Sequence, residues 1–218
     1  MRIICQLSAP QHPLPFDHIP YLTGTIHKWI GNNKVHGEIS LYSFSWLQGG
    51  KSVKQGLSFP DGGQWSISSH DTDLIKSIIQ GIQEDSEICF GMRVHDITIV
   101  KTPDFGTEAR FLLASPVLIK RRDGERIEHV LFDHPNAGDY LTEKMVTKLK
   151  KANLNAEGIS IDFDKMYRAP KTKLVNYRGI KNKASMCPIL VKGSPEQIAF
   201  VWNVGVGNST GIGFGALK

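Results

Sequence analysis

Cysteine is scarce in this sequence, and no metal-binding or disulfide pattern can be assembled from it. Cys5, Cys89 and Cys187 stand far apart, with no CxxC pair and no cluster of cysteine and histidine at metal-ligand spacing. Structural zinc sites and disulfide-stapled folds both depend on such clusters. We therefore expect three buried or inert thiols in a reducing compartment, with no metal ion and no cofactor.

Long apolar runs are missing as well. No stretch approaches the ~20 consecutive apolar residues of a membrane helix, and the apolar run that includes Ile3 and Leu7 is too short for a signal peptide. Hydrophobic residues make up 40% of the chain and charged residues 22%, which is typical of a globular protein and not of a disordered one. We expect a soluble protein of the cytoplasm that does not associate with membranes.

Complete nucleotide-binding motifs are also absent, although two stretches imitate them. Gly49-Gly50-Lys51-Ser52 would need a further glycine where Ser45 stands, and no helical pattern follows it. Residues 205–215 have the spacing GxGxxxGxGxG, which differs from the dinucleotide fingerprint and has no crossover helix after it. We expect neither an NTP site nor a Rossmann domain.

Positive charge is concentrated in one part of the sequence. Residues 120–183 contain 15 Lys and Arg against 9 Asp and Glu, whereas residues 1–119 contain 9 against 11 and residues 184–218 contain 2 against 1. A basic segment of this kind is typical of a face that binds a polyanion. A lysine-rich surface that is only solvated has the same charge distribution in the sequence. The distribution favours nucleic acid as a partner without establishing it.

Apolar residues recur with strand and helix periods that predict a βαββαβ unit in the first half. The expected strands cover residues 3–7, 39–47, 64–70 and 86–101, and the expected helices cover 17–30, capped by Asp17, and 71–83. On the first helix, Tyr21 and Lys28 fall on the flank opposite the apolar stripe and so face outward. This order is the ferredoxin-like arrangement shared by RNA-recognition modules.

The same order repeats in the second half. Strands are expected over 108–120, interrupted at Ser115-Pro116, over 158–163 and within 175–191, and helices over 139–152 and from Ser194 to Trp202. A final strand is expected after residue 205, where apolar residues alternate with glycine. We therefore predict an α+β fold of tandem ferredoxin-like modules, with domains at residues 1–104 and 105–218.

Five glycines lie within eleven positions near the C-terminal end of the sequence: Gly205, Gly207, Gly211, Gly213 and Gly215. Backbone without a Cβ can adopt positive φ and approach a ligand closely. Exposed N–H groups in such a loop can bind the phosphates of a nucleic acid. A flexible tail is the alternative, but such a tail rarely contains large apolar residues such as Ile212 and Phe214.

This loop is entered through Trp202-Asn203-Val204, after a helix that starts at Ser194-Pro195-Glu196. In both respects it resembles the C-terminal glycine-rich loop of the CRISPR repeat-RNA-processing endoribonucleases of the RAMP superfamily. Ser115-Pro116-Val117 also falls where that family often begins its second half. The resemblance implies an enzyme of the prokaryotic cytoplasm that cuts CRISPR precursor transcripts within the repeat, producing guide RNAs for antiviral defence.

The resemblance leaves several alternatives open. A homodimer and membership of a CRISPR effector complex are both compatible with it. A non-catalytic RNA-binding subunit with the same tandem fold is the second hypothesis. An unrelated RNA-recognition protein is the third, although the aromatic strand motifs that would favour it are not found.

RNA can be cut without a metal ion when its own 2′-OH attacks the adjacent phosphorus, since only proton transfers and charge stabilisation are then needed. Histidine is suited to these transfers because its ordinary pKa lies near neutrality. The resemblance implies this route, with 5′-OH and 2′,3′-cyclic phosphate ends. It assigns the acid/base role to His36, on the loop before Phe44-Ser45-Trp46-Leu47. His27, on the preceding helix, can share or replace that role.

Two further catalytic residues are expected from the resemblance. Tyr21 matches the family's helix-borne tyrosine in its position relative to His36. The supporting cation is harder to place, because Tyr42 stands where some relatives carry lysine. Lys51 is our prediction for that role, with Lys34 and Lys54 as neighbours and a site without lysine as the alternative.

The RNA track is expected on the basic segment and the glycine-rich loop. Lys144, Lys148 and Lys151 recur at i, i+4 and i+7 beside the apolar stripe of their helix, which predicts a cationic ridge. A later basic stretch is interleaved with Tyr167 and Tyr177, which can stack on unpaired bases. The full predicted set is Lys144, Lys148, Lys151, Arg168, Lys171, Lys173, Arg178, Gly205, Gly207, Gly211, Gly213 and Gly215. A solvated basic hairpin is the alternative for the later stretch.

Overall fold

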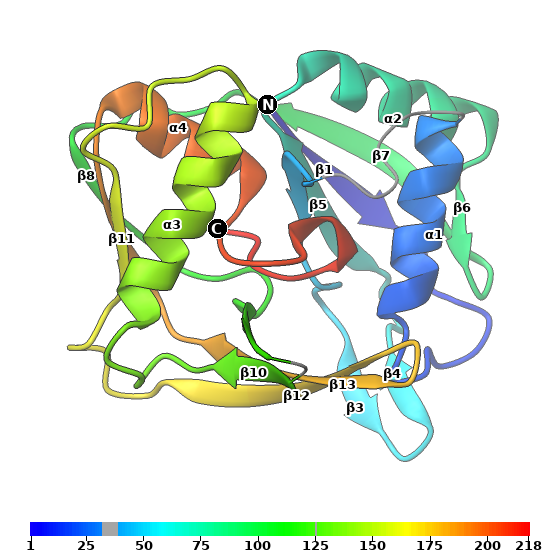
Figure 1. The fold of residues 1–218 in the computed structure, drawn as a ribbon. Helices are drawn as coiled ribbons and strands as arrows, with labels where there is room; N and C mark the ends of the chain where they lie inside the picture. The colour runs from blue at the N-terminus through cyan, green and yellow to red at the C-terminus, as the bar shows by residue number, and fades with distance from the viewer. Residues whose placement is uncertain (32–38, 125) are drawn as a thin grey trace.

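The computed structural model describes residues 1–31, 39–124 and 126–218, and each half of the chain builds an antiparallel sheet (Figure 1). The elements of the N-terminal half are β1 (Arg2–Leu7), α1 (Ile19–Ile30), β2 (Tyr42–Phe44), β3 (Lys51–Val53), β4 (Gly56–Ser58), β5 (Gly63–Ser69), α2 (Thr72–Glu84), β6 (Glu87–Cys89) and β7 (Met92–Val100). Its five-stranded sheet has the order β2-β5-β1-β7-β6, and each neighbouring pair is antiparallel. Apart from β6 and the inserted β3–β4 hairpin, this is the predicted βαββαβ unit.

Helices α1 and α2 cover one face of this sheet because each element presents one apolar face, formed by every second residue of a strand and every third or fourth residue of a helix. The side chains that meet between them include Ile3, Cys5, Leu7, Leu22, Ile26, Trp65, Ile75 and Ile78, each at most 2% exposed. At the start of α2 the Asp71 carboxylate accepts hydrogen bonds from the N–H groups of Asp73 and Leu74. This cap fixes where the helix begins.

Three predicted boundaries in the N-terminal half are wrong. Residues 86–101 form the β6–β7 hairpin instead of one strand, because Phe90 and Gly91 have φ of 52° and 76° and make a two-residue turn. Helix α1 begins after His18, so Asp17 is not its cap. The strand expected over residues 39–47 is limited to β2, and beyond it the N–H of Trp46 donates to the carbonyl of Ala114 in the other half.

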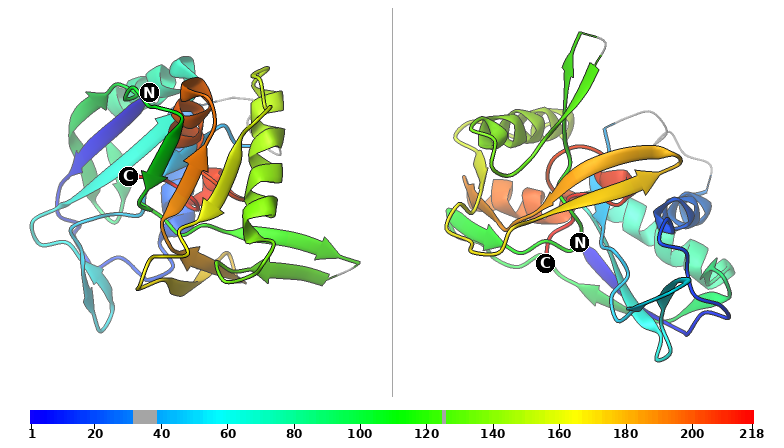
Figure 2. Two further views of the ribbon diagram at one scale, coloured as in Figure 1. Left: turned by 90° about the vertical axis from the view of Figure 1, so that its left-hand side faces the viewer. Right: turned by 90° about the horizontal axis from the view of Figure 1, so that it is seen from below.

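The C-terminal half contains more elements than predicted. They are β8 (Glu108–Phe111), β9 (Ile119–Asp123), β10 (Arg126–Val130), α3 (Ala137–Lys151), β11 (Ser160–Phe163), β12 (Lys171–Tyr177), β13 (Ile180–Met186), β14 (Ile189–Lys192), α4 (Pro195–Val204) and the 3₁₀ helix η1 (Thr210–Ile212). Strands β11-β14-β8 form the sheet, while β9–β10 and β12–β13 are separate hairpins, the first of which projects from the body (Figure 2). The strand expected over 108–120 is therefore two strands in two different sheets.

The final strand predicted after residue 205 is wrong. Only Leu217 makes a bridge, to Leu113 beyond the end of β8, and the N–H of Lys218 donates to the carbonyl of Leu112. With Leu217 beside β8, the order of strands matches that of the N-terminal sheet, but its fourth strand is reduced to one bridge. Gly213 and Gly215 have φ of 91° and 66°, and these left-handed conformations turn the chain out of the strand that its alternating pattern suggested.

The core consists of one apolar cluster in each half and a small third cluster between them. The third cluster joins Leu118, Val175, Ala184 and Phe214 of the C-terminal half to Trp46 of the N-terminal half. The glycine-rich loop, residues 205–215, thus runs through the junction of the two halves, between α1 and α3 (Figure 1). The domain boundary expected at residues 104 and 105 falls in the segment between β7 and β8 and stays a prediction.

Candidate nucleic-acid interface

A pocket of about 500 Å³ opens where the glycine-rich loop meets both halves of the chain. Its lining comes from five segments: Thr23, Gly24 and His27 of α1; Ile39, Ser40 and Tyr42 around the start of β2; Lys144 and Lys148 of α3; Tyr177 and Arg178 of the β12–β13 hairpin; and residues 207–212 of the loop. We call this the junction pocket. It brings the basic segment of the sequence next to the first helix.

The glycine-rich loop is buried over most of its length, which corrects the expectation that its backbone N–H groups are exposed. All five of its glycines are buried, and its backbone is tied to neighbouring segments. The Asn208 N–H donates to the carbonyl of Leu118 over 2.7 Å, and the Gly215 N–H donates to Pro116 over 2.8 Å. The N-terminal half holds it too, because the Tyr42 hydroxyl donates to the Gly211 carbonyl over 3.2 Å. Only residues 207–212 reach the pocket.

Two of the glycines are required by close packing. At Gly215, which has φ of 66°, a Cβ would overlap the carbonyl oxygen of Val206. At Gly211 a Cβ would lie against the side chain of Ser40 and 3.0 Å from the ring of Tyr42. The glycines therefore serve first to let the backbone pass between the two halves, and through this packing they place the loop in the pocket wall.

Lys148 is buried, which corrects its predicted place on an exposed cationic ridge. Its side chain is 2% exposed, while Lys144 is half-buried and Lys151 is exposed. The Lys148 Nζ donates to Thr210 Oγ1 over 3.0 Å and to the carbonyl oxygens of Val204 and Gly205, both over 3.3 Å. Burial, and secondarily the charge of Lys144, lowers the pKa of Lys148 to about 7.

The junction pocket is positively charged in the part that the structure describes. Lys144, Lys148 and Arg178 line it together with His27, and none of its described lining residues is a carboxylate. Arg178 occupies the two-residue turn of the β12–β13 hairpin with φ of 51°, next to Tyr177, and its guanidinium carbon lies 5.7 Å from the centre of that ring. This combination offers cations for phosphate and an aromatic face for a base.

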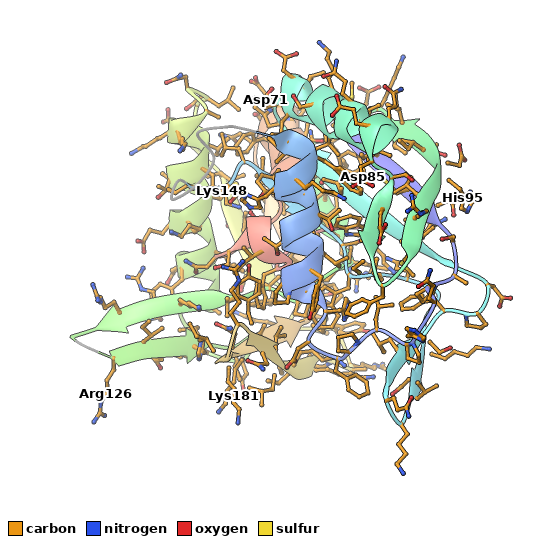
Figure 3. The ribbon with its side chains drawn as sticks, turned by 90° about the vertical axis from the view of Figure 1, so that its right-hand side faces the viewer. Asp71, Asp85, His95, Arg126, Lys148 and Lys181 are labelled. Atoms are coloured by element: carbon orange, nitrogen blue, oxygen red, sulfur yellow. The ribbon has the colours of Figure 1, made fainter. Side chains whose placement is uncertain are left out.

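Further cations lie on the two hairpins, outside the pocket. Arg126 stands near the end of the β9–β10 hairpin and Lys181 on β13, and both point to solvent (Figure 3). Lys183 is exposed on the same strand as Lys181. None of these three residues lines the junction pocket.

The expected catalytic residues do not all meet in this pocket. His36 lies outside the described residues, while Ile39 and Ser40, which follow it, line the pocket. His27 lines the pocket from α1. Tyr21 is 51% exposed and packs its ring edge-on against Phe90, with the ring centres 5.0 Å apart, and it is not in the lining.

Lys51 is exposed on β3 and does not line the pocket either. Among the predicted RNA-binding residues, the structure brings Lys144, Lys148, Arg178, Gly207 and Gly211 into the lining. The others lie elsewhere: Lys151, Arg168, Lys171 and Lys173 are exposed outside the pocket, and Gly205, Gly213 and Gly215 are buried in the junction.

Sequence reasoning missed several polar lining residues. Thr23 and Ser40 of the N-terminal half and Asn208, Ser209 and Thr210 of the loop all contribute. The run Asn208-Ser209-Thr210 carried a usable signal, because three polar residues interrupt the apolar alternation between Val206 and Ile212. No such signal marked Thr23 or Ser40, which reach the pocket only through the arrangement of the two halves.

The described part of the chain contains neither a candidate membrane helix nor a candidate metal site. None of its helices is long and apolar enough to cross a membrane. Within the same residues, no three or more His, Cys, Asp or Glu side chains form a group that could hold a metal ion.

Comparisons with known proteins agree with one another. The family described as CRISPR associated protein Cas6, C-terminal, matches residues 100–218. A candidate CRISPR-associated endoribonuclease-like protein of Pyrococcus horikoshii, Cas6nc, is 25% identical over 160 residues. That alignment covers 70% of this chain and 66% of the relative, just under two thirds of its length.

Solved structures show the same fold. One is the product of a Cas6-related gene from Pyrococcus furiosus, with a TM-score of 0.84 at 22% identity, covering 100% of this chain and 97% of the other. Another is a RAMP protein described as binding different RNA substrates, with a TM-score of 0.83 at 23% identity, covering 100% and 98%. The likeness extends over both halves, including the tandem α+β arrangement.

Proposed function

Because the chain belongs to the family described as CRISPR associated protein Cas6, C-terminal, we propose that it binds CRISPR repeat RNA and cleaves it in the junction pocket. The proposed reaction needs no metal ion and leaves 5′-OH and 2′,3′-cyclic phosphate ends. Its biological product is guide RNA for antiviral defence. The names of the relatives support RNA as the substrate, since one is called endoribonuclease-like and another is described as binding RNA.

One observation carries this proposal. The junction pocket places a histidine of the first helix beside the cations Lys144 and Arg178 and the buried Lys148, with no carboxylate among its described lining residues. A site of this charge favours an anionic ligand, and a phosphodiester is the anion that a histidine can help to cleave. Tyr177 provides a ring on which a base next to that phosphate can stack.

The proposed chemistry is an internal transfer at phosphorus. A histidine accepts the 2′-OH proton while the 2′-oxygen bonds to phosphorus, the bond from phosphorus to the 5′-oxygen breaks, and a proton donor protonates that leaving oxygen. His27, which lines the pocket, and His36, three residues before the lining residue Ile39 in the sequence, are the two candidates for these proton transfers. Lys144 and Arg178 would stabilise the negative charge that develops on the phosphate oxygens.

The second candidate function is a non-catalytic RNA-binding subunit, and a specific observation favours it. Tyr21 and Lys51, the expected partners of the catalytic histidine, do not line the junction pocket. A protein that keeps the basic pocket and lacks this set of residues at the phosphate would bind repeat RNA without cutting it. The two functions share the same binding site and differ only in the outcome of the reaction.

Incubation of end-labelled repeat RNA with the protein in EDTA distinguishes the two functions. For the enzyme we expect one cut per repeat, a cyclic phosphate end, and no cut when the nucleotide at that position is 2′-deoxy. The rate should fall by about 10²-fold or more in His36→Ala, the magnitude of general acid–base catalysis, with binding intact. His27→Ala measures whether the helix histidine shares the role.

His95→Ala is the matched control, because His95 is exposed on β7, away from α3 (Figure 3). Cleavage by this variant should equal that of the natural protein. Tight binding of the repeat by the natural protein without any cleavage would rule out the enzyme and support the RNA-binding subunit. A cut that requires added Mg²⁺ would rule out the proposed metal-independent route.

A further inference from the structure

Asn208 carries the only side-chain amide among the described lining residues of the junction pocket. It is half-buried and stands in the glycine-rich loop between Gly207 and Ser209. Both of these neighbours have left-handed backbone, with φ of 74° and 62°. The chain thus turns sharply on each side of Asn208.

Two hydrogen bonds hold Asn208 against the start of β9. Its backbone N–H donates to the carbonyl of Leu118 over 2.7 Å, and its side-chain Oδ1 accepts from the N–H of Lys120 over 3.0 Å. Gly207 permits this close approach, because a Cβ there would lie 2.5 Å from the Leu118 carbonyl oxygen. The fold therefore orients the side chain of Asn208 before any ligand binds, which is what a recognition group requires.

The contact with Lys120 fixes which end of the amide is left over. A backbone N–H only donates, so its partner is the amide oxygen, and the amide nitrogen takes the other position. Nδ2 of Asn208 has no hydrogen-bond partner within the described parts of the chain, and it is not one of the enclosed polar atoms. Asn208 thus offers N–H donors on the side away from Lys120.

This orientation limits which base the amide can recognise. An asparagine with both ends free pairs with adenine, donating to N7 and accepting from the N6 amino group. Asn208 is not free in this way, because its oxygen already accepts from Lys120. The remaining donor matches a keto oxygen, O6 of guanine or O4 of uracil, and opposes the amino group at the same position of adenine or cytosine.

The other polar groups of the described lining do not separate keto from amino bases in this way. The hydroxyls of Ser40 and Ser209 can both donate and accept. Lys144 and Arg178 only donate, but their charge makes phosphate, which every nucleotide carries, the stronger ligand. A neutral donor in a fixed orientation is therefore specific to Asn208.

We propose that Asn208 is a specificity-determining residue of the junction pocket, which donates from Nδ2 to the keto oxygen of a guanine or uracil of the repeat RNA. This inference rests on the proposed RNA-binding function and names the kind of base that the pocket selects at one position. The keto and amino groups lie in the plane of a base, so a base stacked on Tyr177 directs them toward the side of the pocket. An amino base would set one donor against another and bind about tenfold more weakly.

The test measures binding of a 2′-fluoro repeat RNA, which lacks the attacking hydroxyl and so is not cut. Each position of the repeat in turn carries guanine, uracil, adenine or cytosine, and affinities are measured at one ionic strength. We expect one position at which guanine and uracil bind about tenfold more tightly than adenine and cytosine. Replacing that guanine by 2-aminopurine, which lacks O6, should cause the same loss.

The key variant is Asn208→Asp, which keeps the oxygen that accepts from Lys120 and replaces Nδ2 by a second oxygen. An acceptor in that place favours an amino group, so the preference at this position should reverse toward adenine and cytosine. Asn208→Ala should abolish the preference, and it provides the test if Asn208→Asp does not fold.

Asn155→Asp is the matched control, because it adds the same charge to the same kind of amide. Asn155 is exposed outside the pocket, and its Oδ1 also accepts a backbone N–H, from Glu157 over 2.9 Å. This variant should keep the base preference of the natural protein.

The outcomes separate this inference from the proposed function. Equal weakening with all four bases in both Asn208 variants would mean a contact to phosphate and would overturn base recognition. A keto preference that persists in Asn208→Ala, or no preference at any position, would overturn it too, and neither result affects cleavage. A preference that reverses in Asn208→Asp, without cleavage of natural RNA, overturns the enzyme and supports Asn208. Failure of the natural protein to bind repeat RNA overturns both.

Discussion

The two halves of the molecule share an order of elements but end differently. In the N-terminal half, β7 (Met92–Val100) runs beside β1 along its length. In the C-terminal half the corresponding chain makes one bridge at Leu217, and the glycine-rich loop precedes it. The backbone N–H and C=O groups of a fully paired strand form hydrogen bonds within the sheet. The glycine-rich loop instead contacts the other half of the chain and lines the junction pocket. The incomplete module therefore supplies the backbone of the candidate site.

The halves also differ in charge. Residues 1–119 contain 9 Lys and Arg against 11 Asp and Glu, and residues 120–183 contain 15 against 9. The N-terminal half contributes a histidine, two hydroxyls and a tyrosine to the junction pocket, while its cations come from the C-terminal half. Proton transfer and anion binding are thus assigned to different modules in our proposal, and this division can be tested from both sides.

The largest expected effect concerns the loop that replaces the fourth strand. Gly215→Ala adds a Cβ that overlaps Val206 O at a residue with φ of 66°, so strain and overpacking should together lower the free energy of unfolding by about 3 kcal/mol or more. Urea unfolding measures the loss. Gly106→Ala, where a Cβ meets nothing within 4 Å, should change stability by less than about 0.5 kcal/mol. Equal effects at the two positions would contradict the packing role of the loop.

The next effect concerns the buried lysine of the C-terminal half. The folded-state pKa of Lys148 is lowered to about 7, while an unfolded chain has the ordinary lysine value. Between those values the unfolded chain binds more protons, so raising the pH stabilises the folded protein. From pH 7 to 8 we expect the free energy of unfolding to rise by up to about 1.4 kcal/mol per pH unit from this group.

Lys148→Met should remove most of that dependence. A smaller part of the same sign stays, because burial also lowers the pKa of the Met1 amino group. Urea titrations at pH 7.0, 7.5 and 8.0 check it. The window ends there because cysteines of the unfolded chain ionise at about pH 8.5, whereas burial raises the pKa of Cys5 to about 12, so the buried thiols lower stability at higher pH. A variant as pH-dependent as the natural protein would exclude Lys148 as the source.

A smaller effect compares the last helix of each half. Asp71 caps α2 through two backbone N–H groups, and Ser194 caps α4 in a capping box with Gln197. Asp71→Ala and Ser194→Ala should each lower the free energy of unfolding by about 1 kcal/mol. Thermal or urea unfolding of the two variants gives the comparison directly. No loss in a variant would contradict the capping role of that residue, and two separate unfolding transitions would mean that the two modules do not unfold as one unit.

The smallest effect concerns the division of charge. Arg178→Gln, in the junction pocket, should change how strongly salt weakens RNA binding. The slope of log K against log salt concentration should become shallower by about 0.7, the value for one phosphate contact to a single strand. Lys76→Gln removes an exposed cation of α2 in the N-terminal half and should leave the slope unchanged. Binding titrations across a range of KCl concentrations provide the slopes. A change of slope in Lys76→Gln would extend the RNA track beyond the C-terminal half.

The order of elements could be predicted because each depends on local signals. Helix α2 begins one residue after the predicted start at Asp71, α4 begins after the predicted start at Ser194, and the alternation around Cys5 marks β1. The missing fourth strand could not be predicted in the same way. Apolar residues alternating with glycine have the period of a strand, and only the backbone conformations of Gly213 and Gly215 show that the chain turns away.

The site was less accessible to sequence reasoning because it depends on how the halves meet. Lys144, Lys148 and Lys151 share a spacing that places them on one flank of a helix. Which of them is enclosed depends on the position of the C-terminal end of α4, more than fifty residues later. The same limit applies to Tyr21, whose outward direction was correct but whose neighbour is Phe90 and not the pocket.

The glycine-rich loop both packs between the two halves and lines the junction pocket, and this restricts how the protein can adapt to a different repeat. A side chain added at Gly211 would clash with the N-terminal half, and one added at Gly215 would clash with Val206 of the loop itself, so these glycines are poor places to acquire new sequence preferences. Arg178, in the turn of the β12–β13 hairpin, is exposed and also lines the pocket. Diversification of RNA specificity should therefore accumulate in that turn, while the glycines of the loop stay invariant.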